Sequence, residues 1–319
     1  MNLAIIDMGT NTFHLLLVAV NGTSFDVVHK EKVAVKIGEN GINEGLINEE
    51  AIERCLKTLT AFKEKIVAAN ISEVFAIGTS ALRNALNGQQ VIDRIKKEVG
   101  LNPRIISGIE EATYIHYGVS KALQIGPEIS LIMDIGGGSI EFIIANAHEP
   151  LWMESFEIGG QRMLEKFHKT DPIEPAEIKE LKIFLERNLT SLFEACEKFK
   201  PTTLIGSSGT FDTLSEIQQL KTSQPVGEKV TELPMTLSAF KEIFSELIIK
   251  NKEERMAIPG MIALRVDMIV VASVLIEFIL SKLNLTNIRI SSYSLKEGVL
   301  IKTIEEHIHQ NTSPTYINI

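Results

Sequence analysis

The N-terminal third of the chain alternates short apolar runs with polar turns, which predicts strands followed by helices. Apolar runs at 3–6, 13–20 and 24–28 are separated by a turn at 7–12 and by Asn21-Gly22, a pair typical of hairpins. Residues 48–66 then place apolar side chains every three or four positions, which indicates a helix that packs on the sheet. The elements expected next are a strand at 74–77, a loop at 78–83, a helix at 91–99, a strand at 104–106 and a helix from about residue 110.

The second half repeats this pattern. We expect strands at 129–134, 140–145 and 151–157, a helix at 160–167, a loop at 171–175, one long helix at 176–198, a strand at 204–205, a loop at 206–210 that starts another helix, a surface excursion at 218–234, a strand at 288–290 and a terminal helix at 296–307. The most apolar run, 268–280, contains Glu277 and is shorter than the roughly 20 residues that span a bilayer, so it predicts a buried core helix.

Two α/β domains follow from this order of elements. At 319 residues, 45% of them apolar, the chain is long enough for two cores. The helical pattern is interrupted at 124–127, which places a hinge near 120–126. We therefore predict a first domain at 1–122, joined by a C-terminal helix at about 300–319, and a second domain at 123–299.

Net charge and cysteine content indicate which partners and which cellular compartment to expect. A net charge of −9 and a pI near 5.4 argue against nucleic acid and anionic membranes as partners, because both are bound through clustered Lys and Arg. Cys55 and Cys196 fall on apolar helix faces, which predicts two buried thiols and a reducing cytoplasm. Met1 leads directly into the first strand, so we expect no N-terminal signal. The oligomeric state stays open, a homodimer included.

Two turns of the same kind carry the candidate chemistry. In each half an apolar strand ends in Asp-x-Gly and another strand follows, at Asp7–Thr12 and at Asp134–Ser139. Backbone amides at such a turn can cradle a phosphate, and the carboxylates can hold a metal ion. The candidates are Asp7, Thr10 and Asn11 in the first turn, and Asp134, Gly136, Gly137, Gly138, Ser139 and Glu141 in and after the second. The alternative is a plain glycine hairpin turn.

Three further features are weaker candidates. Residues 206–210, with Gly209 and Thr210, form a strand-to-helix loop that could bind phosphate or merely cap the helix. Arg83 follows a loop with two hydroxyls and suits phosphate recognition. Arg265 is less distinctive, since Asp267 could simply pair with it. Glu110 and Glu111 open a helix, where carboxylates are favoured without any function, and the histidines show no metal-ligand spacing.

Six motifs in order resemble one family. They are Asp7–His14, Gly78–Ala85, Ile106–Ala112, Asp134–Glu141, Gly206–Thr210 and Arg265–Asp267, and they resemble the exopolyphosphatase / guanosine pentaphosphate phosphatase family. The resemblance implies two ribonuclease-H-like domains of the actin-like ATPase superfamily with an interdomain cleft. It also implies Mg²⁺-dependent release of terminal phosphate from inorganic polyphosphate or guanosine pentaphosphate.

The resemblance also implies residue roles. Glu111 corresponds to the catalytic carboxylate that activates water, Asp134 and Glu141 to acidic residues that organise the metal, Gly136–Ser139 to the phosphate-binding loop and Arg83 to an arginine near the substrate phosphates. Ser294 and Lys296 stand where the family usually has glycine and arginine, and Thr10 and Thr12 where serines are frequent. The chain matches the short, two-domain members.

Two rival functions remain at this point. A kinase of the same superfamily would move phosphate from ATP to a small metabolite, and it shares the Asp-x-Gly turn. A non-catalytic sensor would bind polyphosphate or a nucleotide without hydrolysing it. The pairing of the motifs at 107–111 and 136–141 is more characteristic of the phosphatases than of the kinases. The presence of Glu111 with Asp134 and Glu141 argues against the sensor.

Overall fold

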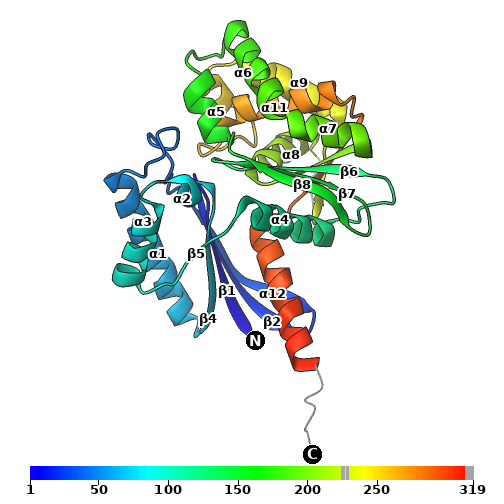
Figure 1. Cartoon of the computed structure of the whole chain (residues 1–319). Coiled ribbons are helices and arrows are strands. Elements are labelled where there is room, and N and C mark those ends of the chain that lie inside the picture. The colour runs from blue at the N-terminus through cyan, green and yellow to red at the C-terminus, as the bar shows by residue number, and fades with distance from the viewer. Residues whose placement is uncertain (224–226, 228–229, 313–319) are drawn as a thin grey trace, which may run out of the picture.

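A computed structural model describes residues 1–223, 227 and 230–312, which fold around two mixed β-sheets (Figure 1). The first sheet has the order β3-β2-β1-β4-β5. Its strands are β1 (Asn2–Met8), β2 (Phe13–Asn21), β3 (Ser24–Val33), β4 (Glu73–Gly78) and β5 (Arg104–Ile105). β1 pairs antiparallel with β2 and parallel with β4, so an antiparallel meander is extended by parallel strands.

The second sheet repeats that topology. Its order is β10-β11-β9-β6-β7-β8. The strands are β6 (Ser130–Ile135), β7 (Ile140–Ala145), β8 (Pro150–Phe156), β9 (Thr203–Ser207), β10 (Glu232–Leu233) and β11 (Asn287–Ser291). β6 takes the place of β1, because it pairs antiparallel with β7 and parallel with β9. The expected α/β fold with two ribonuclease-H-like units is confirmed.

Helices cover the outer faces of both sheets. Those of the first half are α1 (Glu49–Ala68), α2 (Ser80–Asn84), α3 (Gly88–Arg94) and the π-helix η1 (Ile95–Val99), whereas α4 (Gly108–Ala122) lies between the two sheets. Those of the second half are α5 (Gly160–Phe167), α6 (Pro175–Asn188), α7 (Thr190–Phe199), α8 (Gly209–Thr222), α9 (Leu237–Ile249), α10 (Lys252–Met256) and α11 (Met268–Lys282).

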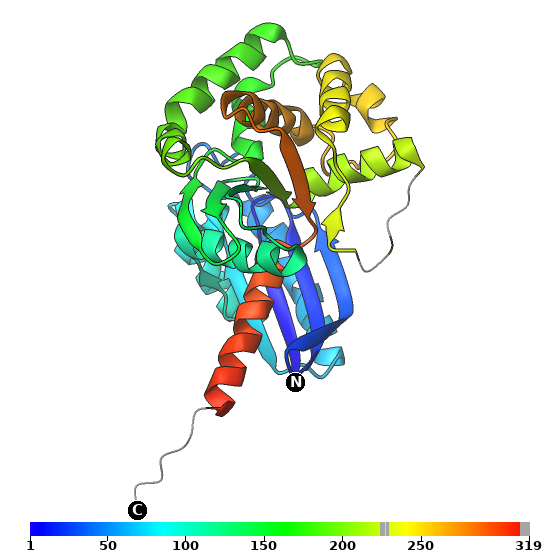
Figure 2. The ribbon, with the colours of Figure 1, turned by 90° about the vertical axis from the view of Figure 1, so that its right-hand side faces the viewer.

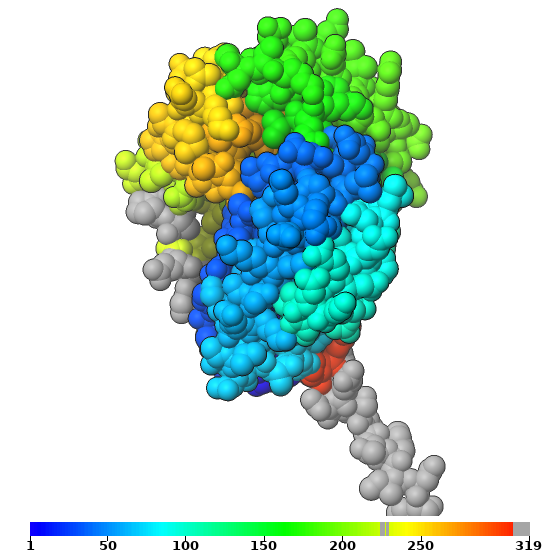
Figure 3. All heavy atoms as spheres, turned by 90° about the vertical axis from the view of Figure 1, so that its left-hand side faces the viewer, coloured from blue at the N-terminus to red at the C-terminus, as the bar shows by residue number. Residues whose placement is uncertain are grey.

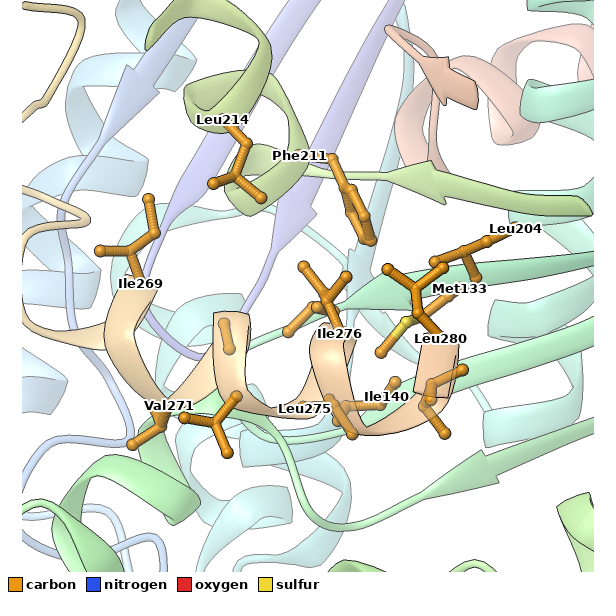
Figure 4. Packing of buried hydrophobic residues seen from close by; sticks show 14 of the residues in the cluster. Met133, Ile140, Leu204, Phe211, Leu214, Ile269, Val271, Leu275, Ile276 and Leu280 are labelled. Atoms are coloured by element: carbon orange, nitrogen blue, oxygen red, sulfur yellow. The ribbon is translucent and has the colours of Figure 1, made fainter. Parts of the chain in front are cut away.

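The apolar helix α11 is the centre of the second core, as its sequence predicted. It packs between the sheet, through Met133 and Leu204, and α8, through Phe211 and Leu214 (Figure 4). A helix that is apolar on all of its faces avoids water only when neighbouring elements cover it on nearly all sides. Among the described helices, none combines the length and the apolar character that crossing a membrane requires.

Two helices, α4 and α12 (Leu295–Thr312), lie at the junction of the halves (Figures 1 and 2). They share one core with residues of both sheets, among them Ile5 of β1 and Ile132 of β6. The helices cross closely at Gly298, where an added Cβ would collide with the carbonyl oxygen of Tyr114. α12 also packs against β1 and β2. The exact domain limits, 1–122 with 300–319 and 123–299, stay a prediction.

The helix predicted at 176–198 was wrong in one respect, because the structure has two helices with a break at Leu189. The Leu189 side chain is fully buried, with φ −107° and ψ 22°. The side-chain amide of Asn188 donates to the carbonyl oxygen of Phe184 at 2.8 Å. Asn side chains compete with helix hydrogen bonds in this way, and the turn lets the chain bury Leu189.

Two other local predictions also need correction. The predicted loop 78–83 contains the short helix α2. The predicted excursion 218–234 is partly structured, because α8 continues to Thr222 and β10 pairs with β11. Residues 224–226 and 228–229 of that excursion lie outside the described residues.

Candidate active site

The two Asp-x-Gly turns have the same backbone geometry. In the first turn the amide of Gly9 donates to the carbonyl oxygen of Thr12 at 3.1 Å, and in the second the amide of Gly136 donates to that of Ser139 at 3.1 Å. Each turn joins the central strand of its sheet to the antiparallel neighbour. The structural repeat therefore extends to the turns that the sequence singled out.

The two turns lie against each other across the junction. An added Cβ at Gly137 would come within 2.8 Å of Asn11 Oδ1, and one at Gly138 would collide with the hydroxyl groups of Thr10 and Ser80. A side chain at either position would push the halves apart. This close approach accounts for glycine at both positions, and phosphate binding by the turn stays a prediction.

A cavity of about 80 Å³ lies where the turns meet. Ten of the residues predicted for the site line it, namely Asp7, Thr10, Asn11, Glu111, Asp134, Gly136, Gly137, Gly138, Ser139 and Arg265. Four do not: Arg83, Glu141, Gly209 and Thr210. The three carboxyl groups on its wall come from the two turns and from the start of α4.

Glu110 and Glu111 differ, although they are neighbours. Glu110 forms a capping box with Ser107 and pairs with Arg104, so it has the structural role that its helix position predicts. Glu111 is buried, and Arg83 donates to it at 2.8 Å. Burial raises the pKa of Glu111 to about 7, although the positive charge of Arg83 opposes this shift.

Several carboxyl groups crowd this cavity. Burial raises the pKa of Asp7 to about 7, and the charge of Asp134 adds to the rise while Lys296 opposes it. Burial and the charges of Glu111 and Asp134 hold the pKa of Glu141 well above its usual range. Buried carboxylates that repel one another gain most from a nearby cation.

The two aspartates have different partners. Asp134 Oδ2 accepts hydrogen bonds from the hydroxyls of Ser207 and Ser294, both at 2.6 Å. The buried Oδ1 of Asp7 has no hydrogen-bond partner within the described part of the chain. Ser294 thus has a defined contact, although the sequence showed it only as a departure from the family pattern.

These residues fit a Mg²⁺ ion that takes few protein ligands. Oxygen donors are what Mg²⁺ prefers, and the unpartnered Asp7 Oδ1 supplies a free one. Across residues 1–223, 227 and 230–312, no three His, Cys, Asp or Glu side chains form a cluster that could hold a metal by themselves. Mg²⁺ often keeps water and binds substrate phosphates through one or two carboxylates, so a sparse donor set suits it.

The two predicted arginines occupy different places. The Arg265 guanidinium lies against Gly209, where an added Cβ would be 2.7 Å from its Cζ. Its buried Nε has no hydrogen-bond partner among the described residues, and Asp267 pairs with Lys252 at 2.7 Å, so the alternative of a simple Arg265–Asp267 pair is excluded. Arg83 instead holds two carboxylates, Glu111 and Glu157, each at 2.8 Å. Phosphate binding by Arg83 stays a prediction.

A second cavity of about 50 Å³ shares a wall with the first. Asp7, His14, Ser208, Arg265, Ser294 and Leu295 line both. Lys32, Lys296 and Asp212 line only the second, as does Gly209. Three cationic side chains therefore stand beside the acid-lined cavity. Thr210 lines neither, and its buried hydroxyl has no partner within the described ranges.

Sequence reasoning missed His14, Ser208 and Lys32 in these cavities. His14 gave no signal because metal-ligand spacing was the criterion, and burial together with nearby cations lowers its pKa well below the usual value. Lys32 lies on β3, opposite His14 in the strand register. The strand predicted at 24–28 ended before Lys32, so no sequence signal indicated this pairing.

Comparisons with known proteins identify the family of this chain. The family described as "Ppx/GppA phosphatase family" matches residues 16–307. Exopolyphosphatase 1 of Mycobacterium leprae is 24% identical, covering 96% of this chain and 90% of that protein. A crystal structure of an exopolyphosphatase from Cytophaga hutchinsonii has a TM-score of 0.93 and 44% identity, over 96% of this chain and 98% of that one. An Aquifex aeolicus Ppx/GppA family member has a TM-score of 0.79 and 25% identity, over 98% and 99% of the two chains. The chain belongs to the Ppx/GppA phosphatase family, as its motifs predicted.

Proposed function

We propose that the protein releases terminal phosphate from inorganic polyphosphate, with guanosine pentaphosphate as a second substrate. The observation that carries this proposal is the position of Glu111, a buried carboxyl group on the wall of a cavity formed by two amide-rich and hydroxyl-rich turns. Exopolyphosphatases among the similar proteins agree with this choice of substrate.

Glu111 is the proposed general base. A base works best when its pKa lies near the working pH, and burial raises the pKa of Glu111 to about 7. At neutral pH a large fraction of Glu111 is ionised and able to take a proton from water. Its place on the cavity wall lets it act on a water molecule beside a bound phosphoryl group.

The turns are proposed to bind the terminal phosphoryl group. Gly136–Ser139 of one half and Thr10 and Asn11 of the other line the cavity. The Gly136 amide closes its own turn, so the proposed donors are the amides of Gly137 and Gly138 and the side chains of Thr10, Asn11 and Ser139. Fixed donors of this kind stabilise the charge of a phosphoryl group in the transition state. Gly209, Thr210 and Arg265 are proposed to extend this surface at the start of α8.

Mg²⁺ is the proposed cofactor, held by Asp7 and Asp134 with Glu141 behind them. When bound, it would neutralise charge on the phosphate oxygens. The residues of the chain have their own part in this: Ser207 and Ser294 fix Asp134, while Asp7 keeps an oxygen free.

The second cavity supports a polyanionic substrate. Lys32, Arg265 and Lys296 stand next to the acid-lined cavity, opposed by Asp212 on the same wall and by Glu297, which pairs with Lys296 at 3.0 Å. Phosphates beyond the terminal one could be bound there while the terminal group reacts.

The two buried free thiols, Cys55 and Cys196, are consistent with a cytoplasmic location.

Phosphate release from long polyphosphate, tripolyphosphate and guanosine pentaphosphate, measured in parallel with Mg²⁺ or EDTA, tests the proposal. We expect Mg²⁺-dependent release from at least the first two. Transfer of phosphate from ATP to a metabolite, without free phosphate, would instead show the rival kinase. Calorimetric binding of polyphosphate with no phosphate release would show a sensor.

A further inference from the structure

Glu157 connects the two halves of the molecule beside the site. It lies between β8 and α5 of the second half. Its Oε2 accepts a hydrogen bond from the hydroxyl of Ser80 at 2.5 Å, and its Oε1 accepts from Arg83 Nη2 at 2.8 Å and Nε at 3.3 Å. Both donors belong to α2 of the first half. None of the motifs that indicated the site includes Glu157.

The same arginine holds Glu111 with its other edge. Arg83 Nη1 donates to Glu111 Oε2 at 2.8 Å and to the carbonyl oxygen of Ile106 at 3.1 Å. A guanidinium is a rigid planar fork, so a carboxylate that fixes one edge also fixes the direction of the other. Glu157, Arg83 and Glu111 therefore form one connected unit, which we term the Glu157 bridge.

Of the three members of the Glu157 bridge, Glu111 alone lines the reacting cavity. Arg83 and Glu157 line a separate depression, with Glu154 and Ser155. Arg83 therefore contacts Glu111 without lining the cavity, so it can orient the carboxyl group without occupying the space proposed for substrate.

Other contacts close the junction along the same edge. Arg162 Nη1 donates to the carbonyl oxygen of Ile42 at 2.7 Å, and Asn43 donates to Glu165 at 3.0 Å. Figure 3 shows the blue segment that precedes α1 abutting the green part of the second half. Because Arg83 and Glu157 come from opposite halves, the Glu157 bridge is complete only when this junction is closed.

We propose that Glu157 is a positioning residue that acts through Arg83 to orient Glu111, and so makes the general base competent only when the two halves meet. The inference rests on the proposed function of Glu111. It assigns Glu157 no contact with substrate. Substrate-induced closure that completes a catalytic site is a known way to restrict reaction to the closed state.

Steady-state kinetics on tripolyphosphate with E157Q, R83M and the double variant tests the bridge. We expect E157Q to lower kcat about tenfold with KM changed less than twofold. Because Glu157 acts through Arg83, E157Q should have no further effect in the R83M background. E154Q is the matched control, since Glu154 lies on the preceding strand β8 and lines the same depression, and it should keep wild-type kinetics.

Two outcomes would overturn the proposal. A lower KM with unchanged kcat in E157Q would show that Glu157 competes with substrate for Arg83. An equal loss of kcat in both backgrounds would show that Glu157 acts independently of Arg83. Phosphate release by the wild-type protein tests the proposed function separately from the bridge. Melting temperatures (Tm) of the wild type, E157Q, R83M and the double variant, measured without substrate, form a double-mutant cycle for stability. Additive Tm shifts would disprove the bridge even if polyphosphate were not a substrate.

Discussion

The Asp7 turn and the Asp134 turn are two copies of one device with different surroundings. Both follow the central strand of a sheet, and both close with a 3.1 Å hydrogen bond between the same relative positions. Asp134 Oδ2 accepts two serine hydroxyls, whereas Asp7 Oδ1 has no partner among the described residues. The repeat preserves the backbone of the turn but not the polar environment of its carboxyl group.

Because of this difference, we expect the two aspartates to contribute differently to cation binding. Two hydroxyl donors hold Asp134 in one orientation, so its geometry does not depend on a ligand. Asp7 Oδ1 is buried without a hydrogen-bond donor among the described residues, and burial raises the pKa of Asp7 to about 7 although Lys296 opposes the rise. A cation would therefore stabilise Asp7 more than Asp134, since no hydrogen-bond donor already stabilises the buried Oδ1 of Asp7.

The largest expected effect comes from Glu111, which belongs to neither turn. E111Q should lower kcat by about 10²–10⁴, the usual loss when a general base is removed, with polyphosphate binding largely retained. Phosphate release and calorimetry measure the two quantities. E110Q is the matched control, because Glu110 caps the helix and should keep full turnover. Wild-type rates in E111Q would mean that the turns alone suffice and Glu111 has no catalytic role.

The comparison predicts opposite stability effects for D7N and D134N at pH 8 in EDTA. The pKa of Asp7 is raised on folding, so its contribution is favourable below about pH 4 and is lost as pH rises through about 7. D7N removes the buried charge and should stabilise the protein by about 1–3 kcal/mol. D134N weakens two hydroxyl contacts and should destabilise it by about 1–2 kcal/mol.

Urea unfolding at pH 8 measures both effects, with and without Mg²⁺. Mg²⁺ should stabilise the wild type more than D7N. If D7N proves less stable than the wild type in EDTA, then Asp7 has a partner that compensates its burial and the contrast between the turns is lost.

A smaller effect is expected where the two turns touch. G138A places a methyl group against the hydroxyls of Thr10 and Ser80, so the halves must separate slightly. Overpacking of this kind costs about 1–3 kcal/mol, and we expect lower stability together with a higher KM. G126A is the control, because an added Cβ at Gly126 meets nothing within 4 Å. Equal behaviour of the two variants would show that the turns are not in tight contact.

The smallest effect is expected from Ser294. S294A removes one of the two hydroxyls on Asp134 and should weaken Mg²⁺ binding, measured by calorimetry, by about 1 kcal/mol. S207A should have the same effect, since its contact has the same length. An unchanged Mg²⁺ affinity in both variants would mean that the orientation of Asp134 does not depend on these hydroxyls.

Local sequence was sufficient for most of the elements and for both turns. Strands ending in Asp-x-Gly and the apolar run of α11 are recognisable because their patterns depend only on neighbouring residues. The break at Leu189 was missed, since residues 176–198 keep a helical pattern and the turn is stabilised only by the burial of Leu189 in the folded protein. Glu111 was distinguished from Glu110 by family resemblance, because the helix-start rule applies equally to both.

The sequence by itself determined two α/β units of one kind, each with an acid-glycine turn, because hydrophobic periodicity and turn chemistry are local properties. Only the tertiary structure decided that the turns face each other, that Asp7 lacks a partner while Asp134 has two, and that Arg83 lies between Glu111 and Glu157. These contacts join residues from about 30 to 160 positions apart. The physical reason is that burial and charge pairing depend on which distant side chains share a space, and packing of α4 and α12 between the two sheets sets that arrangement.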